Sequence, residues 1–382
     1  MSWIIAEERL NPEIHSIIDY NIDGNMCICG FVKTGKTITL MHLLRRIKAQ
    51  APDSRILFLV FSNLLAKIYQ KTFRDFGIRA IIETFWKFRN NDSHYDYIIC
   101  DDVHLMEASL LNKAKDNGNI VIVSINPFLT LFDESPLAKE KPLSLEQVEE
   151  ILSPKVFELH YLHFSHLNPI ISLSKAMLNR DVTIKLPIFN IKHSHQQAIR
   201  ICKAMSKDDE YKFVYDNTQK LLSLRYTTAV LFPTNRQILS FVQFLIKMSG
   251  KQPWAEKNDQ WGRLDFSDLN KYLSSIGLKY QCLGGGFGNI EDIDSKITIM
   301  TYFASMGLQF DNVFMPNMNS DLFINYNEEV SKSLFILALT RACYKVYLTY
   351  SEMLHPYLSY IKDICSAEST CDNNSDGGHL IL

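Results

Sequence analysis

A short stretch near the start of the chain has the residue types and the spacing of a phosphate-binding loop. It fits the pattern G-x-x-x-x-G-K-[ST] and reads Gly30-Phe31-Val32-Lys33-Thr34-Gly35-Lys36-Thr37. Such glycines allow successive backbone N–H groups to face one anion, and the start of the next helix adds positive potential. Lys36 is predicted to contact the β- and γ-phosphates of a nucleoside triphosphate, and the Thr37 hydroxyl to bind Mg²⁺. A glycine turn that only caps a helix is the alternative.

The residues around this loop favour the phosphate-binding interpretation. An apolar run, Met26–Cys29, precedes the loop, and a helical pattern over Ile38–Ile47 follows it. This is the strand–loop–helix setting that the motif requires. We therefore predict that nucleotide contacts come from Gly30, Lys33, Thr34, Gly35, Lys36, Thr37 and Ile38.

Two neighbouring carboxylates, Asp101 and Asp102, directly follow the apolar run Tyr97–Cys100. In a phosphate-loop enzyme the first acid at such a strand end holds Mg²⁺ through water, and the second polarises the attacking water. Acids after an apolar run are also common as helix N-caps. Because the pair follows the loop by about sixty-five residues, we favour the catalytic interpretation.

The elements that must position these groups alternate between apolar runs and helical patterns. Helices are predicted over Ile38–Gln50 and Leu64–Phe76, between short runs that lack clean alternation of polar and apolar residues. Such runs are typical of parallel strands buried on both faces. The rhythm predicts an α/β fold with a doubly wound parallel sheet. The predicted strands are Met26–Cys29, Ile56–Phe61, Ala80–Glu83, Tyr97–Cys100 and Ile120–Ser124.

A second α/β rhythm follows a segment rich in Pro, Glu and Lys over residues 133–155, which suggests a linker. We predict an N-terminal domain over 1–135, a linker and helical connecting region over 136–225, a C-terminal domain over 226–365 and a disordered tail over 366–382. The predicted elements of the C-terminal domain are strands Ala229–Phe232, Ile297–Thr301, Asn312–Met315 and Lys345–Thr349, and helices Arg236–Met248 and Ser331–Arg341.

Composition narrows the class of protein. The 382 residues are 47% hydrophobic and 21% charged, which predicts a globular, soluble chain of two or three domains. A formal net charge of −2 gives no overall attraction to nucleic acid, so such binding needs a local basic patch. Eight scattered cysteines without zinc-type pairing favour a reduced, cytoplasmic protein. We expect no signal peptide and no membrane-spanning segment.

Histidines recur every three residues at His160, His163 and His166, with His193 and His195 further on. This spacing could bring imidazoles to one face of a helix, and imidazole is a zinc ligand. Because no cysteine or acid nearby completes a ligand set, we favour ordinary packing or surface histidines over a metal site.

Several short motifs, in family order, make the chain resemble superfamily 1 helicases of the UvrD/Rep type. Leu334–Ala342, which reads LFILALTRA, is similar to motif VI, and Ile297–Phe314 is similar to motif V. Ala229–Gln237 resembles the strand that opens the second RecA-like domain. Phe61-Ser62-Asn63 and Thr84-Phe85-Trp86 resemble motifs Ia and Ib, which line the single-strand track in the family.

The resemblance implies two RecA-like P-loop NTPase domains with ATP and Mg²⁺ between them. By this likeness Lys36, Thr37 and Asp101 contact the phosphates and the metal, Asp102 orients the attacking water, and Arg341 extends across the cleft to the γ-phosphate. A guanidinium suits the charge that develops on the transferred phosphoryl oxygens. The nucleic-acid contacts that the resemblance implies are Ser62, Asn63, Thr84, Phe85, Trp86, Thr301 and Tyr302.

Departures from the family pattern weaken the predicted coupling between ATP and nucleic acid. Asp102 stands where the family has Glu, and His104 stands where it has Gln. The approach to the adenine-reading Gln is present as Leu10–Glu13, but it ends on Ile14, which leaves base specificity open. Other departures are Met306-Gly307-Leu308-Gln309 in motif V, Val123–Phe128 in motif III and Leu162-His163-Phe164 in place of an Asn-Tyr-Arg segment.

The chain also lacks room for the large helical inserts of processive helicases, so processive strand unwinding is not expected. We predict a compact ATPase that acts on or senses single-stranded nucleic acid, DNA in preference to RNA, together with a protein partner such as a nuclease. The alternative is an ATP-binding regulatory subunit that hydrolyses ATP weakly or not at all, as a clamp or sensor in a complex such as a bacterial antiviral system.

Overall fold

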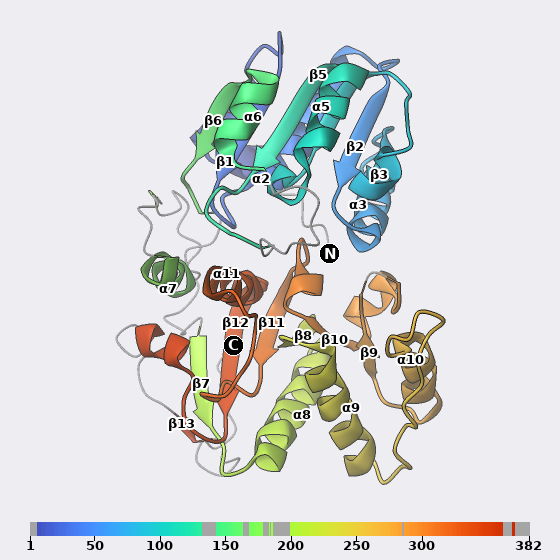
Figure 1. Cartoon of the computed structure of the whole chain (residues 1–382), viewed down its shortest axis with the longest axis vertical. Coiled ribbons are helices and arrows are strands. Elements are labelled where there is room, and N and C mark those ends of the chain that lie inside the picture. The colour runs from blue at the N-terminus through green and yellow to red at the C-terminus, as the bar shows by residue number, and fades with distance from the viewer. Residues whose placement is uncertain are drawn as a thin grey trace. The chain divides into compact units, whose positions relative to one another are not determined.

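The computed structural model describes residues 6–131, 143–162, 168–178, 183, 185, 199–284, 286–361 and 369–370. The chain divides into two compact units (Figure 1). The first unit comprises Met1–Ser165 and Arg180–Lys192, and the second comprises His166–Asn179 and His193–Leu382.

The first unit is built on a six-stranded sheet of order β3-β2-β4-β5-β1-β6, in which every pair of neighbours is parallel. Strands β1 and β2 are buried along their whole length, as expected for short apolar strands with helices on both faces of the sheet. The strands are β1 (Met26–Gly30), β2 (Ile56–Val60), β3 (Ile81–Thr84), β4 (Tyr95–Cys100), β5 (Gly118–Ile125) and β6 (Lys155–Leu159).

Helices cover both faces of this sheet. The helices are α1 (Pro12–Ile18), α2 (Lys36–Gln50), α3 (Asn63–Asp75), α4 (Phe85–Phe88), α5 (Ala108–Asn117) and α6 (Leu145–Leu152). Apolar side chains of α1, α2 and α3 form one core with β1 and β2. Helices α5 and α6 contact each other and lie over the opposite face (Figure 1). This two-sided cover leaves the ends of the strands as the places where polar side chains can gather.

The second unit contains a seven-stranded sheet of order β13-β7-β12-β11-β8-β10-β9, again with parallel neighbours. Helices α8 and α9 pack against β8 and β10, whereas α11 contacts α7 (Figure 1). The strands are β7 (Ile199–Lys203), β8 (Thr228–Phe232), β9 (Tyr280–Cys282), β10 (Ile297–Thr301), β11 (Phe310–Met315), β12 (Ala342–Tyr350) and β13 (Ser369–Thr370). The helices are α7 (Asn168–Leu178), α8 (Lys207–Ser223), α9 (Asn235–Met248), α10 (Phe266–Ser275) and α11 (Glu328–Leu339).

The described part of the chain also contains short 3₁₀ turns, at Glu7–Arg9, Val103–Leu105, Ile290–Asp294, Phe303–Ser305 and Pro356–Ile361. None of the described helices is long and apolar enough to cross a membrane.

The strands and helices predicted from the sequence are present, with ends shifted by at most a few residues. The linker predicted over 133–155 is wrong in its second part. There α6 begins with a capping box, in which Ser144 and Gln147 bond each other's backbone N–H groups, and β6 then joins the first sheet. Strand β7 also lies before residue 226 and pairs with β12. Of the tail predicted to be disordered, Ser369–Thr370 form β13, and the other residues lie outside the described part.

Cysteine thiols are distributed between the two cores. Five described cysteines are buried, at positions 27, 29, 100, 202 and 282, and Cys343 is half-buried. Burial raises the pKa of Cys29 to about 11 and that of Cys27 to about 12, so these thiols are protonated at neutral pH. They pack as small apolar side chains beneath the phosphate loop.

Candidate nucleotide-binding site

The carboxyl ends of the parallel strands of the first unit form one edge of the sheet, and the candidate site lies there. The strand order places β5 between β1 and β4. The loop after β1 and the acids after β4 therefore flank the end of β5, which carries Ser124. This edge is where open parallel sheets bind ligands.

Glycines are required at both ends of the loop that joins β1 to α2. Gly35 has a φ of +98°, in the left-handed region that favours glycine. A Cβ atom on Gly30 would lie 2.6 Å from the Thr34 hydroxyl and 3.0 Å from the carbonyl oxygen of Leu159. The loop thus curls tightly against the end of β6, and α2 starts directly after it at Lys36.

The Lys36 side chain folds over this loop. It is only 8% exposed, and its ammonium donates hydrogen bonds to the carbonyl oxygens of Gly30 at 2.9 Å and of Phe31 at 3.0 Å. The Thr34 hydroxyl also donates to the Phe31 carbonyl, at 2.8 Å. A fixed positive charge therefore lies beside the loop and the first turn of α2, the arrangement expected of a phosphate-binding lysine.

Asp101 is the centre of a network of hydroxyl groups. Thr37 donates to its two carboxylate oxygens at 3.0 and 3.2 Å, Tyr69 donates to Oδ2 at 2.6 Å, and Ser124 donates to Oδ1 at 2.7 Å. Burial, together with the charge of Asp102, raises the pKa of Asp101, whereas the three hydroxyl donors lower it. Hydroxyl and carboxylate oxygens this close together are the hard ligands that Mg²⁺ prefers, so the donor set fits this metal.

Asp102 occupies a constrained backbone position next to this network. Its φ is +56°, a left-handed conformation that Asp and Asn tolerate better than other non-glycine residues, and its N–H donates to the Ser124 hydroxyl at 2.8 Å. The Nδ1 atom of His104 lies 3.9 Å from an Asp102 carboxylate oxygen. Burial lowers the pKa of His104 to about 3, so this imidazole is neutral at pH 7 and does not neutralise Asp102.

Sequence reasoning missed Tyr69 and Ser124 as partners of Asp101. Ser124 lies at the end of a predicted strand, so its position at the edge could have been found from the βαβ pattern. Tyr69 lies within the predicted helix over 64–76, and no sequence signal shows which way its ring turns. Only the packing of α3 on the sheet brings its hydroxyl to the carboxylate.

The candidate nucleic-acid residues of the first unit also follow adjacent strands. Val60 at the end of β2 pairs with Thr84 at the end of β3, which brings Ser62 and Asn63 close to the start of α4. The hydroxyls of Ser62 and Thr84 each cap a helix, by accepting the N–H groups of Leu65 and Lys87.

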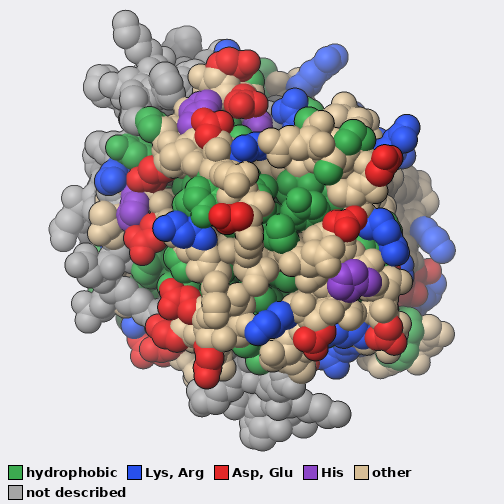
Figure 2. Space-filling view, turned by 90° about the horizontal axis from the view of Figure 1, so that it is seen from above, with side chains coloured by type: hydrophobic (Ala, Val, Ile, Leu, Met, Phe, Trp, Pro, Cys, Tyr) green, Lys and Arg blue, Asp and Glu red, His purple; other side chains and the backbone are tan. Residues whose placement is uncertain are grey.

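The two aromatic side chains of this segment differ in exposure. Phe85 is 3% exposed, and its ring packs edge-on against Phe61. Trp86 is 60% exposed, and the Arg89 guanidinium lies 4.4 Å from its ring centre. Only Trp86 of this pair presents an aromatic face to solvent. On the face of the molecule drawn in Figure 2, acidic and basic side chains are interspersed and do not form a patch of one sign.

The candidate residues of the second unit lie at opposite ends of its parallel strands. Thr301 ends β10, and the Tyr302 ring after it is fully buried, so this ring does not offer a stacking surface. Arg341 precedes β12 at the other end of the sheet. Arg341 is 7% exposed, and its guanidinium donates to the carbonyl oxygens of Leu337 at 2.9 Å and Leu308 at 3.2 Å, and to the Thr340 hydroxyl at 3.0 Å.

The position that reads adenine in the resembled family has no polar group. Ile14 is fully buried in the core of the first unit. Its neighbour Glu13 accepts hydrogen bonds from the His160 N–H at 2.7 Å and from the His160 ring at 3.1 Å, which ties α1 to the end of β6. Among the residues that the structure describes, no cluster of three or more His, Cys, Asp or Glu side chains could hold a metal ion. His163, His166, His193 and His195 lie outside those residues.

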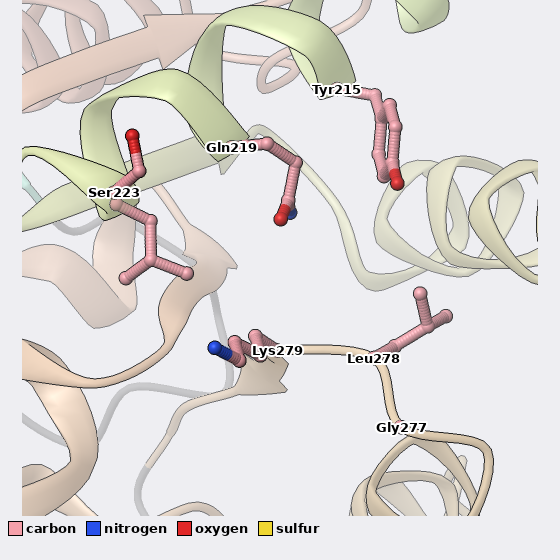
Figure 3. A pocket seen from close by; sticks show the side chains of 7 residues that line it. Tyr215, Gln219, Ser223, Gly277, Leu278 and Lys279 are labelled. Carbon is pink, nitrogen blue, oxygen red and sulfur yellow. The ribbon is translucent and has the colours of Figure 1, made fainter.

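A separate hollow of about 250 Å³ lies in the second unit. Figure 3 shows Gln219, on α8, and Lys279, just before β9, extending toward the same space. None of the predicted nucleotide or nucleic-acid residues lines this hollow. Its lining residues are Tyr215, Gln219, Leu222, Ser223, Gly277, Leu278 and Lys279.

Two family models match the chain. The family model described as type III restriction enzyme, res subunit, matches residues 21–155. The model described as UvrD-like helicase C-terminal domain matches residues 254–353. No curated protein matches. A similar solved structure is the C-terminal domain of a possible DNA helicase from Lactobacillus plantarum WCFS1, at 15% identity and a TM-score of 0.35, covering 55% of this chain and 99% of that chain.

The two family matches fall on different sheets. The first contains the phosphate loop, Asp101 and Asp102, and the second contains β9 to β12 together with Arg341. Each sheet is parallel and flanked by helices, so the two units are RecA-like domains. The two matched family domains support a helicase-like ATPase. With both matches in the order that the motifs predict, the chain is a superfamily 1 helicase-like protein.

Proposed function

We propose that the chain is a compact ATPase that hydrolyses ATP with Mg²⁺ in order to act on or sense single-stranded nucleic acid. The observation that carries this proposal is the 3.0 Å contact between the Thr37 hydroxyl and the Asp101 carboxylate, beside the buried ammonium of Lys36. These groups provide a phosphate-binding charge and a Mg²⁺ ligand set at one edge of a parallel sheet.

Each residue has a distinct part in the proposed reaction. Lys36 and the backbone N–H groups of the loop bind the phosphates, while Thr37 and Asp101 hold Mg²⁺, whose charge offsets that of the β- and γ-phosphates. The carboxylate of Asp102 accepts a hydrogen bond from the attacking water and orients it in line. Arg341 is the residue proposed to stabilise the charge on the transferred phosphoryl oxygens.

Nucleic acid is proposed to bind at the ends of β2 and β3. The exposed Trp86 ring, with Arg89 against it, can stack on an unpaired base, and Ser62, Asn63 and Thr84 lie along the same edge. We propose DNA in preference to RNA, and a protein partner such as a nuclease. The match of residues 21–155 to a restriction-enzyme subunit supports a role beside a nuclease, as in bacterial antiviral systems.

Two observations favour a second function, an ATP-binding regulatory subunit with little or no turnover. Arg341 already has two carbonyl partners and one hydroxyl partner within its own unit. The side chain of Asp102 is also one methylene shorter than that of the Glu at this position in the resembled family. A small misplacement of a catalytic group can slow a reaction by about a hundredfold.

Steady-state ATP hydrolysis, with and without single-stranded DNA or RNA, separates these functions. We expect slow turnover that single-stranded DNA increases, and loss of both nucleotide binding and turnover in Lys36→Ala. Arg45→Ala is the matched control, because Arg45 is an exposed basic residue on the same helix. Tight binding of a fluorescent ATP analogue without measurable turnover would favour the regulatory subunit. Failure of the wild-type chain to bind the analogue would refute both functions.

A further inference from the structure

Tyr69 makes the shortest of the hydrogen bonds described above to Asp101. Its hydroxyl donates to Oδ2 at 2.6 Å, while Ser124 and Thr37 supply the other contacts to the carboxylate. The three donors come from α3, β5 and α2, so the carboxylate is fixed from three elements. A carboxylate held in this way cannot rotate without breaking hydrogen bonds in a buried environment, which is costly.

The core fixes the direction of the Tyr69 hydroxyl. The residue is 4% exposed, and its ring centre lies 4.9 Å from that of Phe58 and 6.3 Å from that of Phe73. Phe58 is on β2 and Phe73 is one turn further along α3. Because the ring is packed on both sides, the position of its oxygen follows the position of α3 itself.

The other end of that helix carries candidate nucleic-acid residues. Helix α3 starts at Asn63 with Ser62 as its N-cap, and Tyr69 lies about two turns, or roughly 10 Å, further along. A helix of thirteen residues packed by its apolar face moves largely as one body. A small shift of α3 when nucleic acid binds would therefore alter the hydrogen bond to Asp101.

We propose that Tyr69 is a positioning residue that orients the Asp101 carboxylate toward Mg²⁺ and makes metal binding respond to nucleic acid bound at the start of α3. This inference rests on the proposed function. Hydrogen-bond donors to a metal-binding carboxylate commonly contribute about tenfold to a hundredfold to metal affinity. Tyr69→Phe removes one oxygen atom and keeps the packed ring, so it isolates the contribution of the hydroxyl group.

The test measures Mn²⁺ binding by electron paramagnetic resonance, in the presence of a non-hydrolysable ATP analogue. We expect Tyr69→Phe to lower Mn²⁺ affinity about tenfold and to leave analogue binding in EDTA unchanged. Tyr95→Phe is the control, because Tyr95 lies at the start of β4, away from Asp101. It is as buried as Tyr69, and its hydroxyl accepts a hydrogen bond from Asn91. Wild-type Mn²⁺ affinity in Tyr69→Phe, or an equal loss in Tyr95→Phe, would overturn the positioning role.

A second comparison tests the response to nucleic acid. Single-stranded DNA is expected to change the Mn²⁺ affinity of the wild-type chain and of Ser124→Ala, which lacks a different donor to Asp101, but not that of Tyr69→Phe. A DNA effect that persists in Tyr69→Phe, or that is absent from the wild-type chain, would overturn the coupling. Absence of any analogue binding by the wild-type chain would instead refute the proposed function, and this inference with it.

Discussion

The hydroxyl oxygen of Thr37 lies 3.0 Å from Oδ2 of Asp101, although sixty-four positions separate the two residues in the chain. The parallel sheet accounts for this proximity. Strand β5 pairs with both β1 and β4, so the segments that leave β1 and β4 emerge at the same edge. Ser124 at the end of β5 completes the arrangement, since it bonds the Asp101 carboxylate and the backbone of Asp102.

Gly30→Ala is expected to damage the phosphate loop. The added methyl group would lie 3.0 Å from the carbonyl oxygen of Leu159, which belongs to the backbone and cannot easily move. We expect a loss of about 1–3 kcal/mol in the free energy of unfolding and at least about tenfold weaker binding of an ATP analogue, measured by urea denaturation and by fluorescence titration. Gly24→Ala is the control, because nothing lies within 4 Å of its added Cβ. Equal effects at both positions would contradict the close approach at Gly30.

Asp102→Asn is expected to separate hydrolysis from binding. Asparagine tolerates the left-handed backbone at this position and can keep the same fold, but it cannot act as a base toward water. We expect turnover to fall by about a hundredfold or more, with ATP-analogue affinity unchanged. The exposed Asp116 on α5 provides the control, Asp116→Asn. Full turnover in Asp102→Asn would show that another group orients the water.

Trp86→Ala is expected to weaken binding of single-stranded DNA about tenfold, since stacking of a base on an aromatic ring contributes roughly 1–3 kcal/mol. The chain offers a closely matched control in Trp261. Trp261 is 68% exposed, and the Arg263 guanidinium lies 4.7 Å from its ring centre. It lies in the second unit and is not among the predicted nucleic-acid contacts. Fluorescence anisotropy of a labelled oligonucleotide measures both variants. Equal losses would point to non-specific stacking, and no loss in Trp86→Ala would exclude a role for this side chain.

Glu210→Gln is expected to make the second unit more stable at neutral and alkaline pH. Glu210 is fully buried on α8 and accepts hydrogen bonds at 2.6 Å from the Asn317 N–H and from the Thr349 hydroxyl. Burial raises the pKa of Glu210 in the folded protein above its value in the unfolded chain, which is about 4.3. The stability that the protonated carboxyl group contributes is therefore fully present below the unfolded pKa and is lost as the pH rises through the folded pKa. Glutamine stays neutral throughout.

The difference in unfolding free energy between Glu210→Gln and the wild-type chain should therefore widen in favour of the variant from pH 5 to pH 8. Urea denaturation at a series of pH values measures it, with the exposed Glu352→Gln as control. A constant difference across this range would mean that Glu210 does not change its protonation on unfolding there.

The sequence predicts β1 to β5 of the first sheet and β8, β10, β11 and β12 of the second, because these strands are apolar runs bounded by helical patterns. The meeting of Thr37 with Asp101 also follows, since a phosphate loop and an acid at a strand end imply a shared sheet edge. The Tyr69 contact does not follow, because it depends on how α3 is rotated on the sheet. The sequence also could not show that Phe85 is buried while Trp86 beside it is exposed, because this depends on how α4 packs against the sheet.

Strand β6, at one edge of the first sheet, was not predicted from the sequence. Lys155–Leu159 carries charged residues at both ends of a short apolar stretch and follows a segment with many charges, so its composition resembles that of a linker. It becomes a strand because Met26–Gly30 offers it an open edge for pairing. Such pairing depends on a partner far away in the chain, and local propensity does not reveal it.

The burial of the cysteines makes the protein suitable for site-selective labelling. Cys343 is the half-buried thiol among the described residues and lies two positions after Arg341, at the start of β12. After replacement of Cys365 and Cys371 by serine, a maleimide fluorophore should attach at Cys343, while the protonated thiols of Cys27 and Cys29 stay unmodified in the folded protein. The emission of such a dye would report, in real time, on the surroundings of the arginine as nucleotide and DNA are added.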